Sequence, residues 1–205
     1  GEIKEGNINV DTLISLAELP NMSEVSDLSE HLEVGALVTL SRIALDKLAG
    51  CYYPALSQAA MSVAMPQIRN VGTLGGNLCQ RPRCWYYRST LYNCFKKGGH
   101  ECFAHTQGNK YHAIFGSDNC CIVHPSDLAV ALLALDAVVC VSSGTDTKDI
   151  PIGQFYVLPE ANVLVETVLE PGEFVSKVKI PKPSSVSKSI YVKVKERQAY
   201  DFALS

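Results

Sequence analysis

The feature that most restricts how this chain can fold is a cysteine-rich segment, residues 77–102, which reads NLCQRPRCWYYRSTLYNCFKKGGHEC. The segment shows little helical or strand periodicity, and the GlyGly pair at 98–99 favours a loop. A loop of this length does not fill a hydrophobic core and needs another source of order. The candidates for that source are its cysteines, Cys79, Cys84, Cys94 and Cys102, followed by Cys120 and Cys121.

Three interpretations of these cysteines stay open on the residues alone. Buried free thiols are expected inside apolar periodic elements, as at Cys51 and Cys140. Disulfides need an oxidising compartment, and the N-terminal residues contain no signal-peptide apolar region. A metal or iron–sulfur site is favoured, although the spacing matches neither the CxxC pairs of structural zinc nor bacterial ferredoxins. The segment also carries bases that would offset the charge of bound thiolates: Arg81, Arg83, Arg88, Lys96 and Lys97.

Composition excludes several classes of protein. The chain has 205 residues, 47% of them hydrophobic, which suits one good core or two small domains. The net charge of −3 without a block of like charge argues against binding to nucleic acid or an anionic membrane. No apolar run approaches the roughly 18 residues of a membrane span, so we expect no membrane insertion. A cytoplasmic location is predicted, unless a partner subunit's signal exports the complex to the periplasm.

The order of expected elements indicates an α+β fold. Helices are predicted over 40–50, capped by Thr39 or Ser41 and ended by Gly50, over 52–64, and over 124–137, with Ser126 or Asp127 near its start. Strands are predicted over 10–19, 31–40, 137–143, 148–157, 162–170 and 173–181, with a glycine-rich loop over 67–78 and a linker over 181–189. Consecutive strands after helices favour α+β over a doubly wound sheet.

The glycine-rich loop contains VGTLGGN at residues 71–77. Gly75 and Gly76 permit positive φ and allow backbone amides to approach an anion closely. A tight turn is the plainer alternative. The string is neither a Rossmann fingerprint nor a P-loop, so any nucleotide bound here would sit in a different fold.

Three strings carry a family resemblance: AMPQIRNVGTLGGNLCQRPRCWYYR at 64–88, HPSDLAVALLALDA at 124–137 and KERQAYDFALS at 195–205. Together they resemble the FAD-binding medium subunit of the molybdenum hydroxylases, the xanthine dehydrogenase and carbon monoxide dehydrogenase family. The resemblance implies an FAD-binding domain of the vanillyl-alcohol-oxidase (PCMH) type over residues 1–180, lacking the family's first flavin loop. It also implies that residues 181–205 are a linker and the start of a C-terminal domain.

The resemblance also implies which residues contact FAD. Thr73, Leu74, Gly75, Gly76 and Asn77 match the loop that lines the pyrophosphate and ribityl part of the cofactor. Asp127 matches an acidic residue that contacts FAD, Leu169 an apolar residue near the flavin ring, and Lys193 a lysine near the isoalloxazine. The plainer alternatives are a helix cap for Asp127 and an exposed strand lysine for Lys193.

An insertion over residues 80–121 separates the glycine-rich loop from the helix at 124–137. It resembles the insertion of the 4-hydroxybenzoyl-CoA reductase and periplasmic aldehyde oxidoreductase branches, which holds an extra [4Fe–4S] cluster. The resemblance implies Cys84, Cys94 and Cys102 as ligands, with Cys120 rather than Cys121 as the fourth. Cys79 belongs to the glycine-rich loop and is interpreted as a non-ligand.

The function implied is electron transfer through cofactors, and no residue is predicted to be catalytic. The chain would pass electrons between the [2Fe–2S] clusters of a small subunit, FAD and an external carrier such as ferredoxin, through the [4Fe–4S] cluster. A large subunit with the molybdenum cofactor would convert the substrate. The alternatives are a zinc-stabilised, non-enzymatic interaction domain and a flavin-free scaffold subunit.

Overall fold

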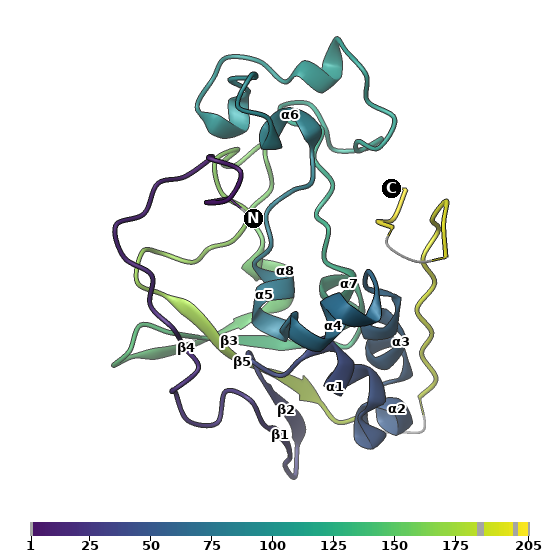
Figure 1. The fold of residues 1–205 in the computed structure, drawn as a ribbon. Coiled ribbons are helices and arrows are strands. Elements are labelled where there is room, and N and C mark those ends of the chain that lie inside the picture. The colour runs from purple at the N-terminus through teal and green to yellow at the C-terminus, as the bar shows by residue number, and fades with distance from the viewer. Residues whose placement is uncertain (1, 184–186, 199–200, 205) are drawn as a thin grey trace.

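The protein folds into a body that carries a smaller cysteine-rich lobe, residues 80–121, at one end (Figure 1). The computed structural model describes residues 2–183, 187–198 and 201–204. The helices are α1 (Leu40–Leu45), α2 (Lys47–Tyr52), α3 (Pro54–Ser62), α4 (Pro66–Val71), α5 (Leu74–Leu78), α6 (Trp85–Arg88), α7 (Asp127–Ala134) and α8 (Ile152–Phe155), with 3-10 turns at Phe95–Lys97 and Phe103–His105. The strands are β1 (Val25–Asp27), β2 (His31–Gly35), β3 (Val138–Ser142), β4 (Thr147–Pro151) and β5 (Phe174–Pro181).

The strands form one antiparallel sheet in the order β1-β2-β5-β3-β4. The predicted strands at 137–143 and 173–181 are confirmed as β3 and the central strand β5. The predicted strand at 31–40 is confirmed over its first half as β2, which ends at Gly35 before α1 begins at Leu40. Apolar and polar side chains alternate along the second half of β5, and this alternation puts the apolar ones on the core face of the sheet. Val178 and Ile180 are buried, while Lys177 and Lys179 are only partly buried. The buried side chains join one core with apolar residues of α1, α3, α5 and α7.

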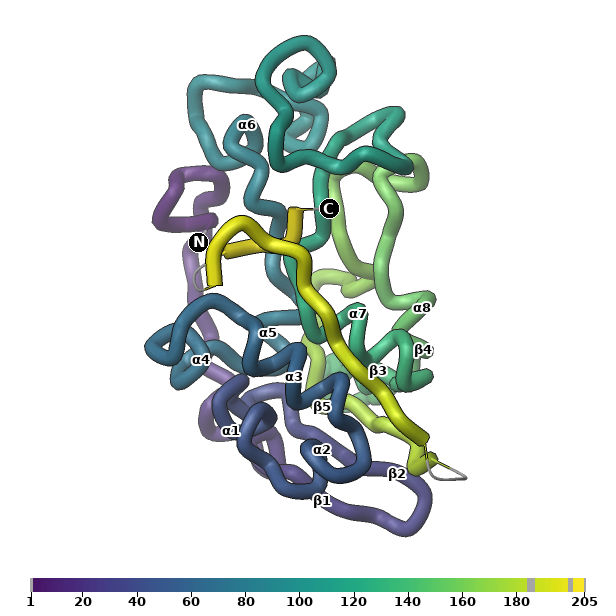
Figure 2. The backbone as a smooth tube through the Cα atoms, turned by 90° about the vertical axis from the view of Figure 1, so that its right-hand side faces the viewer, coloured from purple at the N-terminus to yellow at the C-terminus, as the bar shows by residue number. Residues whose placement is uncertain are grey.

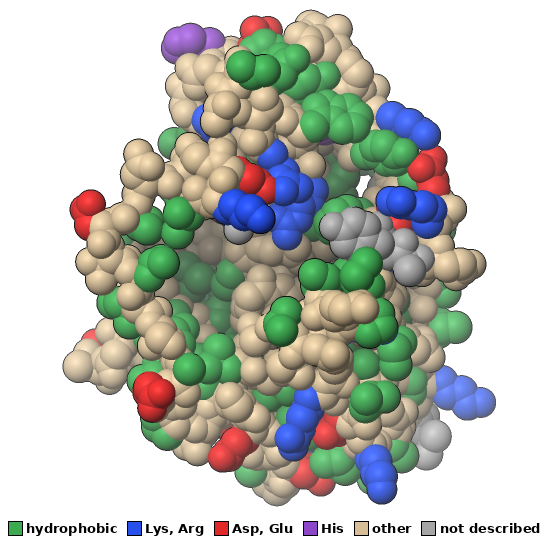
Figure 3. Space-filling view, in the orientation of Figure 1, with side chains coloured by type: hydrophobic (Ala, Val, Ile, Leu, Met, Phe, Trp, Pro, Cys, Tyr) green, Lys and Arg blue, Asp and Glu red, His purple; other side chains and the backbone are tan. Residues whose placement is uncertain are grey.

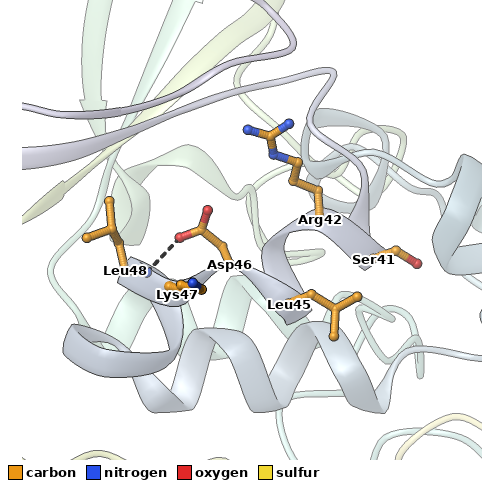
Figure 4. Close-up of a pocket in the computed structure, with 6 residues that line it drawn as sticks. All are labelled: Ser41, Arg42, Leu45, Asp46, Lys47 and Leu48. Atoms are coloured by element: carbon orange, nitrogen blue, oxygen red, sulfur yellow. Dashed lines mark hydrogen bonds between the residues drawn. The ribbon is translucent and has the colours of Figure 1, made fainter.

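The predicted helix over 40–50 is two helices, which meet at Asp46. Thr39 caps α1, as predicted, by accepting a hydrogen bond from the Arg42 amide. The Asp46 backbone is extended, and its carboxylate accepts hydrogen bonds from the amides of Leu48 and Ala49 (2.9 and 3.0 Å), as Figure 4 shows for Leu48. Gly50 therefore lies inside α2, and the prediction that it ends a helix is wrong. A capping aspartate is a stronger boundary signal than an interior glycine.

Three further predictions of secondary structure are corrected. The glycine-rich loop 67–78 is helical, since Pro66 starts α4 and Thr73 caps α5. Residues 10–19 form no strand, and Leu13 and Ile14 remain exposed without a neighbouring strand. Over 148–157, β4 gives way to α8, and over 162–170 the chain makes only an isolated bridge between Thr167 and Tyr156. Apolar residues alone do not make a strand without a partner in register.

The cysteine-rich lobe has a small core of its own. Tyr86, Tyr92 and Phe103 contact one another edge to face or tilted, with ring centroids 4.9–5.9 Å apart. Gly99 permits the tight turn after Cys94, because a Cβ at Gly99 would lie 1.8 Å from the Asn93 carbonyl oxygen. Charged side chains gather where the lobe meets the body (Figure 3). The N-terminal residues contribute there through hydrogen bonds from Tyr87 to Glu2 and from Arg88 to Glu5.

The C-terminal segment lies along the helical side of the body as an extended chain (Figure 2). The Tyr191 amide donates to the Gln58 side chain at 2.9 Å, and the Ala55 amide donates to Ser189 Oγ at 3.1 Å. Both contacts dock the segment on α3. Residues 184–186 of the predicted linker 181–189 lie outside the described part of the chain. In that part, no helix is long and apolar enough to cross a bilayer.

Candidate functional site

Helix α5 brings the predicted residues Thr73 to Asn77 against the sheet. The amides of Leu74 and Gly75 donate to the carbonyls of Val38 and Ala36 at 2.9 and 2.8 Å. The Gly76 amide donates to Thr73 Oγ1, and the Asn77 amide donates to the Thr73 carbonyl. These amides are therefore satisfied within the chain, and the exposed backbone of Gly76 is the part of the turn that a ligand can approach closely.

Asn77 connects α5 to the start of α7. Its Oδ1 accepts a hydrogen bond of 2.6 Å from Ser126 Oγ, and Ser126 Oγ accepts from the Ala129 amide at 3.0 Å. Ser126 is thus the N-cap of α7, as predicted, and Asp127 is the first helical residue. Asn77 and Ser126 are both buried, so this contact holds the glycine-rich turn in a defined position relative to α7.

Asp127 and Lys193, both predicted to contact FAD, are paired with each other. Lys193 Nζ lies 2.9 Å from Asp127 Oδ2, and the side chains are only 4% and 7% exposed. Tyr191 donates its hydroxyl to Asp127 Oδ1 at 2.6 Å. The helix-cap alternative for Asp127 is replaced by Ser126, and the exposed-lysine alternative for Lys193 does not hold. The carboxylate therefore has a partner on each oxygen and is rigidly placed at a cavity wall.

That cavity, called the large cavity below, has a volume of about 380 Å³ and lies between the body, the cysteine-rich lobe and the C-terminal segment. This volume falls at the lower end of the range of ligand-binding pockets. It is lined by Arg83, Cys84, Trp85, Arg88, Tyr111, His112, Val123, His124, Pro125, Ser126, Asp127, Val130, Tyr191, Phe202 and Ala203. The lining combines aromatic rings, cations and one buried carboxylate, which suits a ligand with both a ring system and anionic groups.

His124 lies in the wall of the large cavity. Its ring is 4.5 Å from the Tyr156 ring, and Tyr156 donates its hydroxyl to the Leu78 carbonyl at 3.2 Å. Burial, aided by the positive charge of Lys96, lowers the pKa of His124 to about 4. The imidazole is therefore neutral at pH 7, and its buried Nε2 has no hydrogen-bond partner among the described residues.

Leu169 is not brought to the large cavity. It is partly buried against the main core, two residues after the bridge at Thr167, and it is not among the residues that line the cavity. Its predicted place near a flavin ring stays a prediction.

The four thiols predicted as ligands line a second, smaller cavity, called the thiol cavity below. It lies inside the cysteine-rich lobe and has a volume of about 10 Å³, which is room for about one water molecule. Its walls are Cys84, Tyr86, Tyr87, Cys94, Phe95, Lys96, Cys102, Phe103, Cys120 and Ile122. Cys79, the predicted non-ligand, instead packs against the main core of the body. All eight cysteines of the chain are free thiols, so the disulfide interpretation is not borne out.

The thiol cavity is apolar apart from its sulfurs and one ammonium group. Burial raises the pKa of Cys120 to about 12, and it also raises the pKa of Cys84. These thiols are therefore neutral at pH 7 unless a cation displaces their protons. Lys96, 3% exposed, is held 2.5 Å from Glu166, which also pairs with Arg81 at 2.7 Å. Lys96 places a fixed positive charge in the wall.

Cys84 and His112 lie where the walls of the two cavities meet. Cys84 lines both cavities, and His112 lines the large one. The His112 Nε2 atom lies 3.2 Å from Cys84 Sγ, within hydrogen-bond distance for sulfur. Burial lowers the pKa of His112, which keeps the ring neutral. The two cavities thus share Cys84 in their walls, and His112 contacts its sulfur from the wall of the large cavity.

A second group of metal-binding side chains lies in the same lobe. One ligand atom from each of Cys102, His105 and Cys121 falls within 4.8 Å of the others. His105 is exposed and its Nε2 already contacts the Ser117 carbonyl at 2.8 Å. This trio shares Cys102 with the thiol cavity but uses Cys121 in place of Cys120.

Sequence reasoning missed Tyr191 and His112 as site residues. Tyr191 had a usable signal, because residues two apart on an extended chain point to the same side, which places Tyr191 with Lys193. His112 had none, since it lies far along the chain from Cys84 in a segment without periodicity. His124 precedes Pro125, and a histidine in that setting has too many ordinary explanations for the sequence to assign it to a site.

The chain is similar in sequence to the flavin subunits of molybdenum-containing enzymes. Residues 1–183 match the sequence profile of the FAD binding domain in molybdopterin dehydrogenase. The chain is 40% identical to the aldehyde oxidoreductase FAD-binding subunit PaoB of Escherichia coli strain K12, over 88% of this chain and 57% of that protein. It is 26% identical to subunit alpha of the 6-hydroxypseudooxynicotine dehydrogenase complex of Paenarthrobacter nicotinovorans, over 82% of this chain and 42% of the relative. The chain thus spans about half the length of these relatives.

The fold agrees with solved structures. The crystal structure of a Cu,Mo-CO dehydrogenase superposes with a TM-score of 0.63, at 18% identity, over 92% of this chain and 49% of that one. The CO dehydrogenase of Hydrogenophaga pseudoflava superposes with a TM-score of 0.61. With residues 1–183 matched by the family profile and this fold, the chain belongs to the family of FAD-binding domains of molybdopterin dehydrogenases.

Proposed function

We propose that this chain is part of the electron-transfer flavoprotein subunit of a molybdenum-containing hydroxylase or dehydrogenase complex, and that it binds FAD in the large cavity. The observation that carries the proposal is that the large cavity, with buried Asp127 in its wall, shares Cys84 with a cavity lined by three further thiols. FAD would supply the change between two-electron and one-electron transfer.

The residues of this chain would bind and orient FAD rather than react with it. Asp127, fixed by Lys193 and Tyr191, would accept hydrogen bonds from polar groups of the cofactor. The aromatic wall with Trp85, Tyr111 and His124 would exclude water from a ring system. Four further FAD contacts rest on the family resemblance alone, since none of these residues lines the large cavity: Thr73, Gly76 and Asn77 on the pyrophosphate side, and Leu169 near the flavin ring.

The thiol cavity would hold a [4Fe–4S] cluster on Cys84, Cys94, Cys102 and Cys120. Three properties fit such a group: four cysteines line one cavity, its walls are apolar, and Lys96 beside it would offset the negative charge of the bound thiolates. The lining side chains would have to move apart to hold the cluster, because the cavity has room for about one water molecule. Such a cluster supplies one-electron transfer. Cys120 is preferred to Cys121 because Cys120 lines this cavity, whereas Cys121 points to the Ser117 carbonyl.

The partners would be a large subunit with the molybdenum cofactor, a small subunit with [2Fe–2S] clusters, and an external carrier such as ferredoxin. The likeness to an aldehyde oxidoreductase subunit supports an aldehyde-converting complex, with the substrate site on the large subunit. A cytoplasmic location stays a prediction from the sequence.

A zinc-stabilised domain is the second candidate function, and the trio Cys102, His105 and Cys121 is the observation that favours it. Zinc accepts this mixture of thiolate and imidazole ligands. The trio supplies three ligands rather than four, and His105 is exposed, so it is the weaker site. A flavin-free scaffold subunit has no specific observation in its favour.

One experiment separates these functions. The full-length protein is purified anaerobically with its partners, and its iron, zinc and acid-released flavin are measured. We expect one FAD and about four irons per chain, as a [4Fe–4S] cluster requires. Cys120→Ser should remove the iron and the EPR signal of the cluster, while the matched variant Cys121→Ser should keep both. Zinc without iron, lost in Cys121→Ser and kept in Cys120→Ser, would establish the zinc domain instead.

A further inference from the structure

The hydrogen bond between His112 and Cys84 leads to one further inference, which rests on the proposed cluster. Of the four thiols in the thiol cavity, Cys84 is the one that also lines the large cavity. His112 Nε2 lies 3.2 Å from its sulfur. The imidazole therefore contacts the thiol on the side that faces the proposed flavin.

The surroundings of His112 fix its orientation. The ring is 6% exposed and meets the Trp85 ring edge to face, with centroids 5.0 Å apart. The Tyr86 ring lies 5.9 Å from the His112 ring on the same side as Trp85, since the Trp85 and Tyr86 rings are themselves 6.0 Å apart. The backbone amide of His112 donates to the Asn109 carbonyl at 3.0 Å. Packing against the two rings, together with this backbone hydrogen bond, holds the imidazole nitrogen on the sulfur.

The chemistry of the pair decides which nitrogen carries the proton. A thiolate that ligates a metal only accepts hydrogen bonds, so the nitrogen that faces Cys84 must carry the proton. The other nitrogen, Nδ1, is buried and has no hydrogen-bond partner among the described residues. A proton on Nε2 therefore satisfies the sulfur of Cys84.

We propose that His112 is a positioning residue that donates an Nε2–H···Sγ hydrogen bond to the cluster ligand Cys84 and thereby raises the reduction potential of the cluster. The physical reason is that a hydrogen bond to a ligand sulfur withdraws negative charge, and this stabilises the reduced cluster more than the oxidised one. His112 contacts Cys84, the cluster ligand that also lines the proposed FAD cavity, and it thereby fixes the position of the Cys84 side chain between the two cofactors.

The test is an EPR-monitored redox titration of the cluster in the purified, full-length complex. His112→Phe keeps an aromatic ring beside Trp85 and Tyr86 but removes the donor. We expect the variant to retain its iron, with a ratio of reduced to oxidised cluster about tenfold lower at a fixed potential, which is 59 mV for a one-electron couple. His100→Phe, an exposed histidine of the same lobe, should leave the potential unchanged.

An unchanged potential in His112→Phe would overturn the proposal, as would loss of iron in a variant that is otherwise folded, because His112 would then be a ligand. A second measurement needs no variant. In protein labelled with ¹⁵N-histidine, pulsed EPR of the reduced cluster should detect a weakly coupled histidine nitrogen, and its absence would also refute the hydrogen bond. A wild-type complex without iron would instead refute the proposed function, so the two failures are distinguishable.

Discussion

The buried pair of Asp127 and Lys193 makes the sharpest prediction about the stability of the site. Its side chains are 7% and 4% exposed, and Nζ lies 2.9 Å from Oδ2. Lys193→Met keeps a long apolar side chain but leaves the carboxylate with Tyr191 as its remaining partner. Removing one member of a buried pair leaves an uncompensated charge and costs about 3–5 kcal/mol. We expect the free energy of unfolding to fall by that amount.

The double variant Asp127→Asn/Lys193→Met tests the reason for this loss. With both charges removed, no buried ion lacks its partner, and the double variant should be more stable than the sum of the single changes predicts, by about 2 kcal/mol or more. Urea unfolding of the full-length subunit, followed by far-UV circular dichroism, measures all three variants. Lys188→Met, on the exposed side of the same segment, should change stability by no more than about 0.5 kcal/mol.

Two results would refute this reasoning. A loss below about 1 kcal/mol in Lys193→Met would mean that the pair behaves as a solvated surface ion pair. Strict additivity in the double variant would mean that Asp127 and Lys193 do not interact. Either result would also remove the argument that Asp127 is held rigidly for a cofactor.

The remaining predictions concern packing and pH. Gly75→Ala should lower the free energy of unfolding by about 1–3 kcal/mol, because the new Cβ would lie 2.9 Å from the Cβ of buried Ala36. Gly50→Ala should instead raise it by about 0.5–1 kcal/mol, because the space around Gly50 in α2 is open. Equal effects of the two variants on the melting temperature would contradict the packing argument. Phe155→Ala should cost about 3–5 kcal/mol in urea unfolding, since Phe155 is fully buried, and a smaller loss would mean that the core collapses around the gap. The pKa of His124 is lowered to about 4 in the folded protein, so between about pH 6.5 and 4 the unfolded chain binds a proton that the folded protein does not. The free energy of unfolding of the FAD-free protein should therefore fall by up to about 3 kcal/mol as the pH drops through this range. A His124→Phe variant with the same dependence of unfolding free energy on pH would refute this assignment.

Much of the local structure could be predicted from the sequence. Thr39 and Ser126 cap helices as their residue types suggest, and the alternation in β2 and β5 identifies buried strands. These features depend on neighbours within a few residues, where hydrogen-bond and packing preferences act directly. The predictions failed where a local pattern needed a distant partner, as for residues 10–19, or where a cap outweighed a glycine, as at Asp46.

Some features of the candidate site could likewise be predicted from the sequence, and others could not. Residue types and motif strings predicted Asp127, Lys193 and the four thiols as site residues, and the structure places Asp127 in the wall of the large cavity and the four thiols in that of the thiol cavity. They did not indicate that Asp127 and Lys193 would bind each other, or that Cys84 would line two cavities.

The sequence by itself determined the family, the helix caps, the strand periodicity and the chemical types of the candidate ligands, because each of these is encoded in residues that lie close together along the chain. Only the tertiary structure decided the pairing of Asp127 with Lys193 and Tyr191, the position of Cys84 in the walls of two cavities, and the place of His112 on the sulfur of Cys84. These contacts join segments that are far apart in sequence. They form only when the C-terminal segment docks on α3 and α7 and when the cysteine-rich lobe builds its own aromatic core, so they depend on the packing of the whole chain.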